Sequence, residues 1–462
     1  MAAILLPSKN SSSYGVWRFA QAPFLNRAVG GKIRIGIFGH VGNKNLGDEA
    51  IITAVIQNVR SRLPDAVLCC FSINPEDSCA RHKVPAFPIR RIDRAKPSAA
   101  LKDTSNVLAP RQRGVKDRLK RLPRLYSSLR AIKNAALIPG LVYSELAFLR
   151  FSYRNAKDID LLIIAGSNQF LDNFGGAWGF PYTLFKWSVL AKLVGAKLAF
   201  VSVGAGPIDG KLSKWFIKGC LVMADYVSFR DDGSRQLIHE IDPRRGGGAV
   251  PDLAFSMGPQ RGSPARTHSS RQTVGINPMP VYDSRYWAQP DAAKYENYVR
   301  KLAQFSSALL LRGHPVFFFS TQIRDELVIS DICSHLNSEA RSRGDEMVRV
   351  ASSVEDLMSI IACADLIVAT RFHGVLLALH AEKPVMAICY QKKTYELMAN
   401  MEQSDYAFEL DNFDVETMLA RFDALEFNSS REISKIRKKK EQGQMALNEQ
   451  YSKVLGLLKY AA

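Results

Sequence analysis

The chain has 462 residues, 47% of them hydrophobic, and a net charge of +18 at pH 7. This length allows two domains with full hydrophobic cores, and the composition excludes a disordered or fibrous protein. The seven cysteines lack CxxC or Cys/His metal spacing, so we expect reduced core cysteines and no metal site.

The sequence shows no targeting or membrane-spanning pattern. Its first apolar run, residues 2–6, is too short for a secretory signal, and no run reaches the ~18 residues of a membrane-spanning helix. Residues 1–30 have no periodicity and predict a poorly ordered leader. We therefore expect a cytoplasmic protein.

A buried strand is expected over residues 33–40, followed by a helix over residues 49–60. The turn between them, VGNKNLGDEA, brings glycines to a helix N-terminus, where an anion or a hydroxyl can bind. Asn45, Gly47 and Asp48 either serve a ligand in this loop or cap the helix, and both interpretations stay open.

Most of the positive charge lies in one segment. Residues 81–154 hold 18 Lys or Arg against four acids, a net charge of +14, which leaves +4 for the other 388 residues. Residues 75–114 are rich in Pro, Arg and Ser and predict a long loop. Residues 116–154 repeat basic and leucine positions at helical spacing, and Pro123 and Pro139 divide them into short helices. The pattern is typical of a helix on a membrane surface and equally of a basic face over the core.

Strand–turn–helix units recur after this segment, with strands expected over residues 158–165, 197–203 and 226–229. They predict a parallel, doubly wound sheet, in which ligands bind beyond the carboxyl ends of the strands. The polar residues and glycines that follow these strands are Asn168, Asp172, Gly204, Gly206 and Arg230.

A second α/β unit follows the Gly-, Pro- and Ser-rich linker of residues 257–272. We therefore predict an α/β protein of two Rossmann-like domains, residues 31–256 and 273–427, with the basic insertion in the first. Residues 428–462 predict a helical tail that packs back on the first domain.

The stretch from 364 to 393, ADLIVATRFHGVLLALHAEKPVMAICYQKK, contains two buried strands with polar residues at their ends. Arg371 and His373 follow one strand, and Tyr390 and Lys393 follow the other. Each alone has a structural explanation, such as an ion pair with a core acid or a core histidine. Four of them at neighbouring strand ends favour a site for a small anion with phosphate or carboxylate groups.

Six segments resemble the polysaccharide pyruvyl transferase family. They are GNKNLGDEA, AGSNQFLD, VSVGAGPI, SFRDDGS, VPDLAF and TRFHGVLLALHAEKPVMAICYQKK, in the family's order and within residues 33–398. The family's three glycines in the second segment are here Ala165, Gly166 and Ser167, so this turn departs from the pattern.

The resemblance implies two Rossmann-like domains that face each other across a cleft, as in GT-B glycosyltransferases. It also implies transfer of pyruvate from phosphoenolpyruvate (PEP) to two hydroxyls of a sugar, forming a cyclic ketal. The acceptor would belong to an exopolysaccharide or a lipid-linked oligosaccharide, at the cytoplasmic face of a membrane. PEP is the donor substrate, and no cofactor is expected.

Roles for individual residues follow from this chemistry. His373 is expected to be the acid–base group, because the reference pKa of histidine lies near working pH. Arg230 and Arg371 would bind the PEP anions, with Lys393 as a third cation and Tyr390 beside them. The hydroxyls of the acceptor would meet Asp48 and Asp172, with the remaining loop residues Asn45, Gly47, Asn168, Gly204 and Gly206 around them.

Two alternatives remain. A GT-B glycosyltransferase with a nucleotide-sugar needs a carboxylate for the ribose, and Glu382 and Glu396 are the acids near the predicted site. A nucleic-acid-binding protein would use the basic segment, but no RNP, helix-turn-helix or KH pattern is present, so we expect no nucleic-acid partner.

Overall fold

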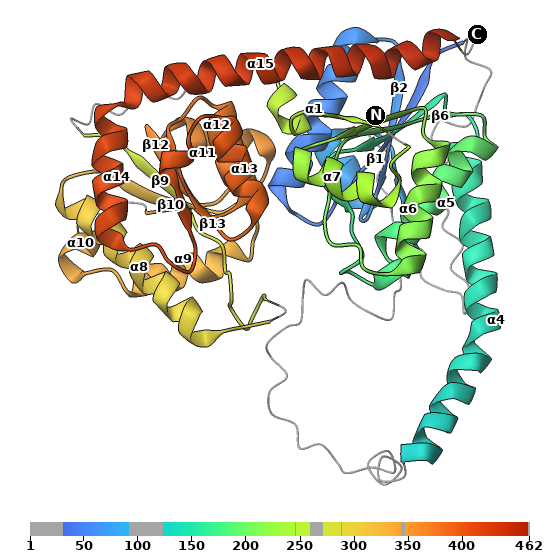
Figure 1. Cartoon of the computed structure of the whole chain (residues 1–462), viewed down its shortest axis with the longest axis horizontal. Coiled ribbons are helices and arrows are strands. Elements are labelled where there is room, and N and C mark those ends of the chain that lie inside the picture. The colour runs from blue at the N-terminus through green and yellow to red at the C-terminus, as the bar shows by residue number, and fades with distance from the viewer. Residues whose placement is uncertain are drawn as a thin grey trace.

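The computed structural model describes residues 31–91, 123–244, 246–258, 271–287, 289–342 and 347–460. Two parallel sheets form the centres of two domains, which lie side by side (Figure 1). The expected leader, residues 92–122 of the basic segment and residues 259–270 of the linker lie outside the described residues.

The first sheet has the order β3-β2-β1-β4-β6-β7-β8, and β5 pairs with β6. Every residue of β4 is buried, as expected for a central parallel strand with both faces covered. The strands are β1 (Arg34–Phe38), β2 (Val67–Ser72), β3 (Ala86–Pro88), β4 (Leu161–Ala165), β5 (Asn168–Phe170), β6 (Lys197–Ala205), β7 (Tyr226–Phe229) and β8 (Gly248–Ala249). The helices are α1 (Leu46–Arg62), α2 (Pro75–His82), α4 (Pro123–Ala156), η2 (Gly176–Trp178), α5 (Phe180–Leu193), α6 (Lys211–Met223), α7 (Asp232–Ile241) and η3 (Leu253–Ser256).

The second sheet has the order β11-β10-β9-β12-β13-β14 and is also parallel throughout. Its strands are β9 (Val274–Asn277), β10 (Val316–Phe319), β11 (Val348–Arg349), β12 (Leu366–Ala369), β13 (Val385–Cys389) and β14 (Ala407–Glu409). The helices are α8 (Ala292–Leu311), α9 (Asp325–Ser334), α10 (Ser338–Ser342), α11 (Val354–Ala362), α12 (Phe372–His380), α13 (Lys392–Asn400), η4 (Ser404–Tyr406) and α14 (Val415–Phe427).

The tail forms one long helix, α15 (Ser429–Gly456), followed by η5 (Leu457–Tyr460). Figure 1 shows α15 running along both domains. In the second domain, its Glu432 accepts a hydrogen bond of 2.8 Å from Gln403. In the first domain, its Gln450 donates to the Ser202 hydroxyl at 2.9 Å. The tail therefore packs on the first domain, as the sequence predicts, and also ties it to the second.

Two expectations for the basic segment are wrong. Residues 75–88 do not belong to a loop, because they form α2 and β3; Asn74 caps α2, and Pro75 suits the first turn of a helix. The predicted short helices are a single helix, α4. Pro123 is its first residue, where the missing N–H costs nothing, and Pro139 lies within it and removes only one backbone hydrogen bond.

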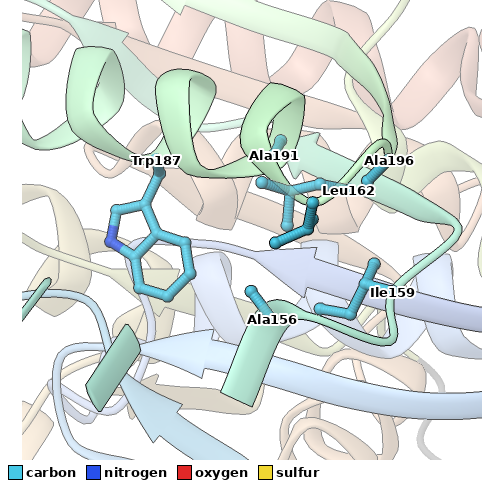
Figure 2. Close-up of a pocket in the computed structure, with 7 residues that line it drawn as sticks. Ala156, Ile159, Leu162, Trp187, Ala191 and Ala196 are labelled. Atoms are coloured by element: carbon cyan, nitrogen blue, oxygen red, sulfur yellow. The ribbon is translucent and has the colours of Figure 1, made fainter. Parts of the chain in front are cut away.

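The described helices include none that is both long enough and apolar enough to cross a bilayer. A small apolar cavity of about 10 Å³ lies between the end of α4, β4 and α5, beside Trp187 (Figure 2). Its walls are aliphatic and aromatic, and its volume is at the lower limit for one water molecule. This cavity is a packing defect and offers no room for a substrate.

Candidate active site

The loop before α1 and the start of α12 meet between the two domains. The backbone N–H of Leu46 donates to the carbonyl of Thr321 at 3.1 Å, which joins the domains directly beside the predicted residues. A Cβ atom added to Gly47 would lie 2.2 Å from Cγ and from Nδ1 of His373. Gly47 and His373, predicted from opposite ends of the chain, are thus in contact.

Replacement of Gly47 by alanine is therefore expected to displace the His373 ring and to lower turnover at least tenfold. The clash involves the inner atoms of the ring, which cannot move aside as the end of a flexible side chain can. The measurement is kcat for the proposed transfer reaction, with Gly140→Ala as the control because nothing lies within 4 Å of a Cβ atom there. Unchanged turnover in Gly47→Ala would contradict the placement of His373.

Asp48 is a buried carboxylate held by three neighbours. Its oxygens accept hydrogen bonds from Asn45 Nδ2 at 2.6 Å and Ser167 Oγ at 2.9 Å, and His40 Nδ1 lies 3.8 Å away. Burial raises the pKa of Asp48, but the hydrogen bond and charge of His40 and the charge of His373 together lower it. The side chain of Asn45 also accepts from the N–H of Gly47, so Asn45 is the helix cap, and the Asp48 carboxylate is left to interact with Ser167 and His40.

Ser167 stands where the family has a glycine. Its φ of 58° lies in the left-handed region, which a glycine adopts without strain and a serine only at a cost. The serine hydroxyl donates to Asp48, a contact that glycine would not make. The departure from the family pattern thus preserves the turn and adds a hydrogen bond to the buried carboxylate.

His373 presents a neutral imidazole to the site. Its Nε2 atom is buried and has no hydrogen-bond partner among the described residues. Burial lowers the pKa of His373, and the negative charges of Asp252 and Asp48 offset only part of this effect. An unprotonated ring with an available nitrogen can accept a proton from a bound hydroxyl.

Arg230 and Lys393 approach the ring of Phe372 from different domains. Arg230 Cζ lies 4.7 Å and Lys393 Nζ 5.1 Å from the ring centroid. Arg230 also donates to Asn168 Oδ1 at 2.6 Å, and its Nη1 lies 3.5 Å from Asp252 Oδ2. Arg230 is buried and Lys393 is half-buried, so the electrostatic interactions of these cations are stronger than they would be in water.

A cavity of about 350 Å³ opens beside these cations. Arg230, Lys393, Phe372 and Asp252 form one part of its wall. The rest comes from α13, α15, the start of α7, the segment from β8 to η3 and Leu376 of α12. Burial and the charge of Arg230 lower the pKa of Lys393 to about 8, against the opposing effect of Asp48, Asp231 and Asp252. The cavity therefore offers an anion one permanent cation and one that titrates near working pH.

Arg371 and Tyr390 belong to an adjoining cluster in the second domain. Arg371 Nε donates to the buried Asp325 carboxylate at 2.7 and 2.8 Å, which is the ion pair with a core acid that the sequence left open. Burial raises the pKa of Tyr390 to about 12, and the charges of Arg371 and, more weakly, Arg230 oppose this rise. The pKa of Tyr390 thus depends on both cations, but the charge of Arg371 is already balanced by Asp325.

Asp172 and Gly206 have local roles in the structure. Asp172 Oδ2 accepts from the N–H of Gly210 at 2.9 Å, at the start of α6. The N–H of Gly206 donates to the carbonyl of Phe170, and a Cβ atom there would contact Leu171. Gly204, in contrast, leaves room for the pair of Asn168 and Arg230, since a Cβ atom would lie 2.4 Å from Asn168 Oδ1.

Three residues of the site were missed by sequence reasoning. Asp252 lies in the apolar segment VPDLAF, where a single acid was a signal of a buried polar role; its Oδ2 is buried without a hydrogen-bond partner among the described residues. His40 follows β1 and Ser167 follows β4, so both lie beyond the carboxyl ends of strands, where ligands bind in a parallel sheet. Within the described ranges, no group of three or more His, Cys, Asp or Glu is placed to bind a metal.

Comparisons with known proteins agree on family and fold. The family model for polysaccharide pyruvyl transferase matches residues 45–391, and no curated protein matches the chain. The UDP-GlcNAc 2-epimerase of Neisseria meningitidis bound to UDP-GlcNAc has a TM-score of 0.51 at 9% identity, covering 91% of this chain and 99% of that chain. A structure from Listeria monocytogenes, also assigned as a UDP-N-acetylglucosamine 2-epimerase, has a TM-score of 0.50 at 8% identity, covering 88% of this chain and 91% of that chain.

At these identities the two epimerases are similar in fold alone. They confirm the predicted architecture of two Rossmann-like domains, which the parallel sheets show independently. The family model spans both domains, from Asn45 at the cap of α1 to the strand ends around His373. The predicted resemblance is confirmed, and this transferase chain belongs to the polysaccharide pyruvyl transferase family.

Proposed function

We propose that this protein transfers pyruvate from PEP to two hydroxyls of one sugar and releases phosphate. The observation that carries this proposal is that Arg230 and Lys393 meet at the ring of Phe372 beside an open cavity. His373 follows Phe372 in the chain and lies within the electrostatic reach of both cations. PEP bears a carboxylate and a phosphate, and two positive donors from different domains match that pair of anions. No cofactor enters the reaction, because PEP supplies both the pyruvyl carbon skeleton and the leaving group.

His373 is proposed as the acid–base group. Its neutral imidazole takes the proton from the first attacking hydroxyl, and the imidazolium so formed can return a proton to the methylene carbon of PEP. The first hydroxyl adds to the central carbon of PEP. The second hydroxyl then displaces phosphate at the same carbon: the C–O bond to phosphate breaks, phosphate leaves with the proton of the second hydroxyl, and a cyclic ketal remains. Arg230 and Lys393 offset the charge on phosphate as it leaves, and Arg371 supports them from its ion pair with Asp325.

The acceptor hydroxyls are assigned to the side of the cleft that holds Asp48. This carboxylate lies in the Coulombic field of His373, so a sugar hydroxyl held there would also be near the base. Asp172 remains a proposal for the outer part of the acceptor, at the start of α6. The surrounding loop residues Asn45, Gly47, Asn168 and Gly204 keep the carboxylate and Arg230 in position.

The glycosyltransferase alternative has less support. It needs a free carboxylate for a nucleotide ribose, but Glu382 is paired with Arg437 at 2.9 Å and with Lys440 at 3.0 Å. Glu396 lies 3.3 Å from Lys392. Both carboxylates are thus in ion pairs, and neither is free to hold the ribose of a nucleotide-sugar.

The acceptor class is proposed to be an exopolysaccharide unit or a lipid-linked oligosaccharide, modified at the cytoplasmic face of a membrane. Basic residues 116–154 are proposed to contact that membrane peripherally. Lys120 and Arg121 of this segment lie outside the described residues. No nucleic acid is needed for any step.

The test is phosphate release from PEP with and without candidate acceptors, compared with UDP release from UDP-sugars. Acceptor-dependent phosphate release, with a pyruvate-sized mass increase on a lipid-linked oligosaccharide, would support the proposal. UDP release without PEP turnover would overturn it in favour of glycosyl transfer.

The pKa of Lys393 gives a pH prediction. Because this pKa is about 8, Lys393 is charged below pH 8 and loses its charge above it. The KM for PEP is therefore expected to rise several-fold between pH 7.5 and 9, measured by steady-state phosphate release. Lys393→Arg keeps the charge throughout and should flatten the rise, whereas an unchanged rise in that variant would place the titrating group elsewhere.

A further inference from the structure

Exposed aromatic side chains gather on the outer face of the helical layer over the first sheet. Phe174, Trp178 and Trp215 are 67%, 68% and 59% exposed. The rings of Trp178 and Trp215 belong to one cluster, because the centroid of Phe216 lies 5.8 Å from that of Trp178 and 5.3 Å from that of Trp215. Leu212 and Val222 on α6 are also exposed. A patch of this kind on a folded protein marks a surface that contacts something else.

Lysines share this face of α6. The helix KLSKWFIKGCLVM has no acid, and its exposed positions include Lys211, Lys214 and Lys218. Its inner face, with Phe216, Ile217, Cys220 and Leu221, is buried in the domain. The fold therefore uses the inner face, and Lys211 and Lys214 lie outside it. Trp215 stays largely exposed, although its ring lies 5.2 Å from that of Phe185 on α5, and Lys218 lies 3.9 Å from Asp242 Oδ1.

We propose that α6 and the loop of residues 172–179, called here the α6 face, contact an anionic phospholipid bilayer. Tryptophan and lysine side by side are what an interfacial surface needs, since the indole enters the headgroup layer and the ammonium group binds lipid phosphate. The proposal deepens the proposed function, on which it rests for the idea of a lipid-linked acceptor. It assigns membrane contact to the α6 face, with the C-terminal half of α4 beside it, and not to residues 116–154 alone.

The α6 face continues into the candidate active site. Phe180, directly after η2, has its ring 4.9 Å from that of His40, and His40 lies 3.8 Å from Asp48. Asp172 anchors the loop to the first turn of α6 through Gly210. A sugar on a membrane-bound carrier would thus reach Asp48 along a short path from the bilayer.

The neighbouring helix α4 extends the same surface. Glu145 of α4 accepts from Lys186 and Tyr182 of α5 at 2.9 and 3.1 Å, which fixes α4 beside α5. Exposed apolar side chains continue along α4 at Leu141, Val142, Tyr143 and Leu146. Helices α4 and α6 and the loop of residues 172–179 thus present exposed apolar side chains, an extent that favours a bilayer over a single sugar ring. The three lysines of α6 would repel their counterparts across a symmetric dimer contact.

The experiment is co-sedimentation of the full chain with phosphatidylglycerol/phosphatidylcholine vesicles and with pure phosphatidylcholine vesicles. Wild type is expected to bind the anionic vesicles and to be released by salt. The variant Lys211→Glu/Lys214→Glu/Trp215→Ser is expected to bind at least tenfold more weakly. A matched control is Phe427→Ser/Arg431→Glu/Lys438→Glu, which changes one exposed aromatic and two exposed cations on α14 and α15. This control should bind as wild type does.

If the α6 variant binds vesicles as strongly as wild type does, the proposal is overturned and membrane contact is left to residues 116–154. Loss of vesicle binding only in the control variant would also overturn the proposal and would place the membrane contact on α14 and α15. A wild-type dimer that dissociates in the α6 variant, with no vesicle binding, would show that a second copy covers this face. With a water-soluble acceptor, both variants should release phosphate from PEP as fast as wild type does. This measurement distinguishes a failure of pyruvyl transfer from a failure of vesicle binding.

Discussion

Replacement of His373 by alanine is expected to lower kcat by roughly 10²–10⁴-fold, the usual contribution of a general acid–base group. The Nε2 atom is buried without a partner among the described residues, and Asp48 and Asp252 lie within its electrostatic reach. The variant should still bind PEP, because Arg230 and Lys393 remain. The measurements are kcat from phosphate release and PEP affinity by calorimetry.

His380 provides a matched control in the same helix. It is buried seven residues further along α12, and burial lowers its pKa to about 4, so it is neutral at working pH. His380→Ala is expected to lower thermal stability while kcat per folded molecule is retained. If His373→Ala stays within tenfold of wild type, or if both variants lose turnover equally, His373 is not the proton carrier.

The second large effect is expected at Arg230. Arg230→Ala removes the cation and leaves Asp252 without its charged neighbour at 3.5 Å, so an anion at this position would meet a net negative environment. We expect kcat/KM for PEP to fall by about 10²–10³-fold, as for loss of one partner of a buried charge pair. Arg230→Lys keeps the charge but loses the planar fork that reaches Asn168, so its main effect should be a raised KM.

The double variant Arg230→Ala/Asp252→Asn separates the effect of Arg230 on thermal stability from its effect on PEP binding. It removes the unpaired carboxylate and should restore thermal stability without restoring PEP affinity. Arg312→Lys, at an exposed ion pair with Asp423, is the control for an arginine outside the site. An unchanged KM in both Arg230→Lys and Arg230→Ala would leave Arg230 as a structural residue between the domains.

Local pattern was sufficient for the strands and for where ligands would bind. The apolar runs of β4 and β12 are buried on both faces of parallel sheets, so their composition alone distinguishes them from surface strands. Polar residues at the ends of the predicted strands were site candidates because ligands bind beyond the carboxyl ends of strands in a parallel sheet. The prolines led to wrong predictions for α2 and α4, a loop and a set of short helices. Proline is favourable at the start of a helix, and the sequence alone does not show where a helix starts.

The sequence by itself determined the family, the two α/β domains and the residue types of an anion site with a histidine. Only the tertiary structure decided which of these residues meet, because contacts between the domains depend on side chains more than 100 residues apart. It brought His373 against Gly47 and both Arg230 and Lys393 onto Phe372, and it paired Arg371 with Asp325. The lowered pKa values of His373 and Lys393 likewise arise from burial between two domains, which no local pattern records.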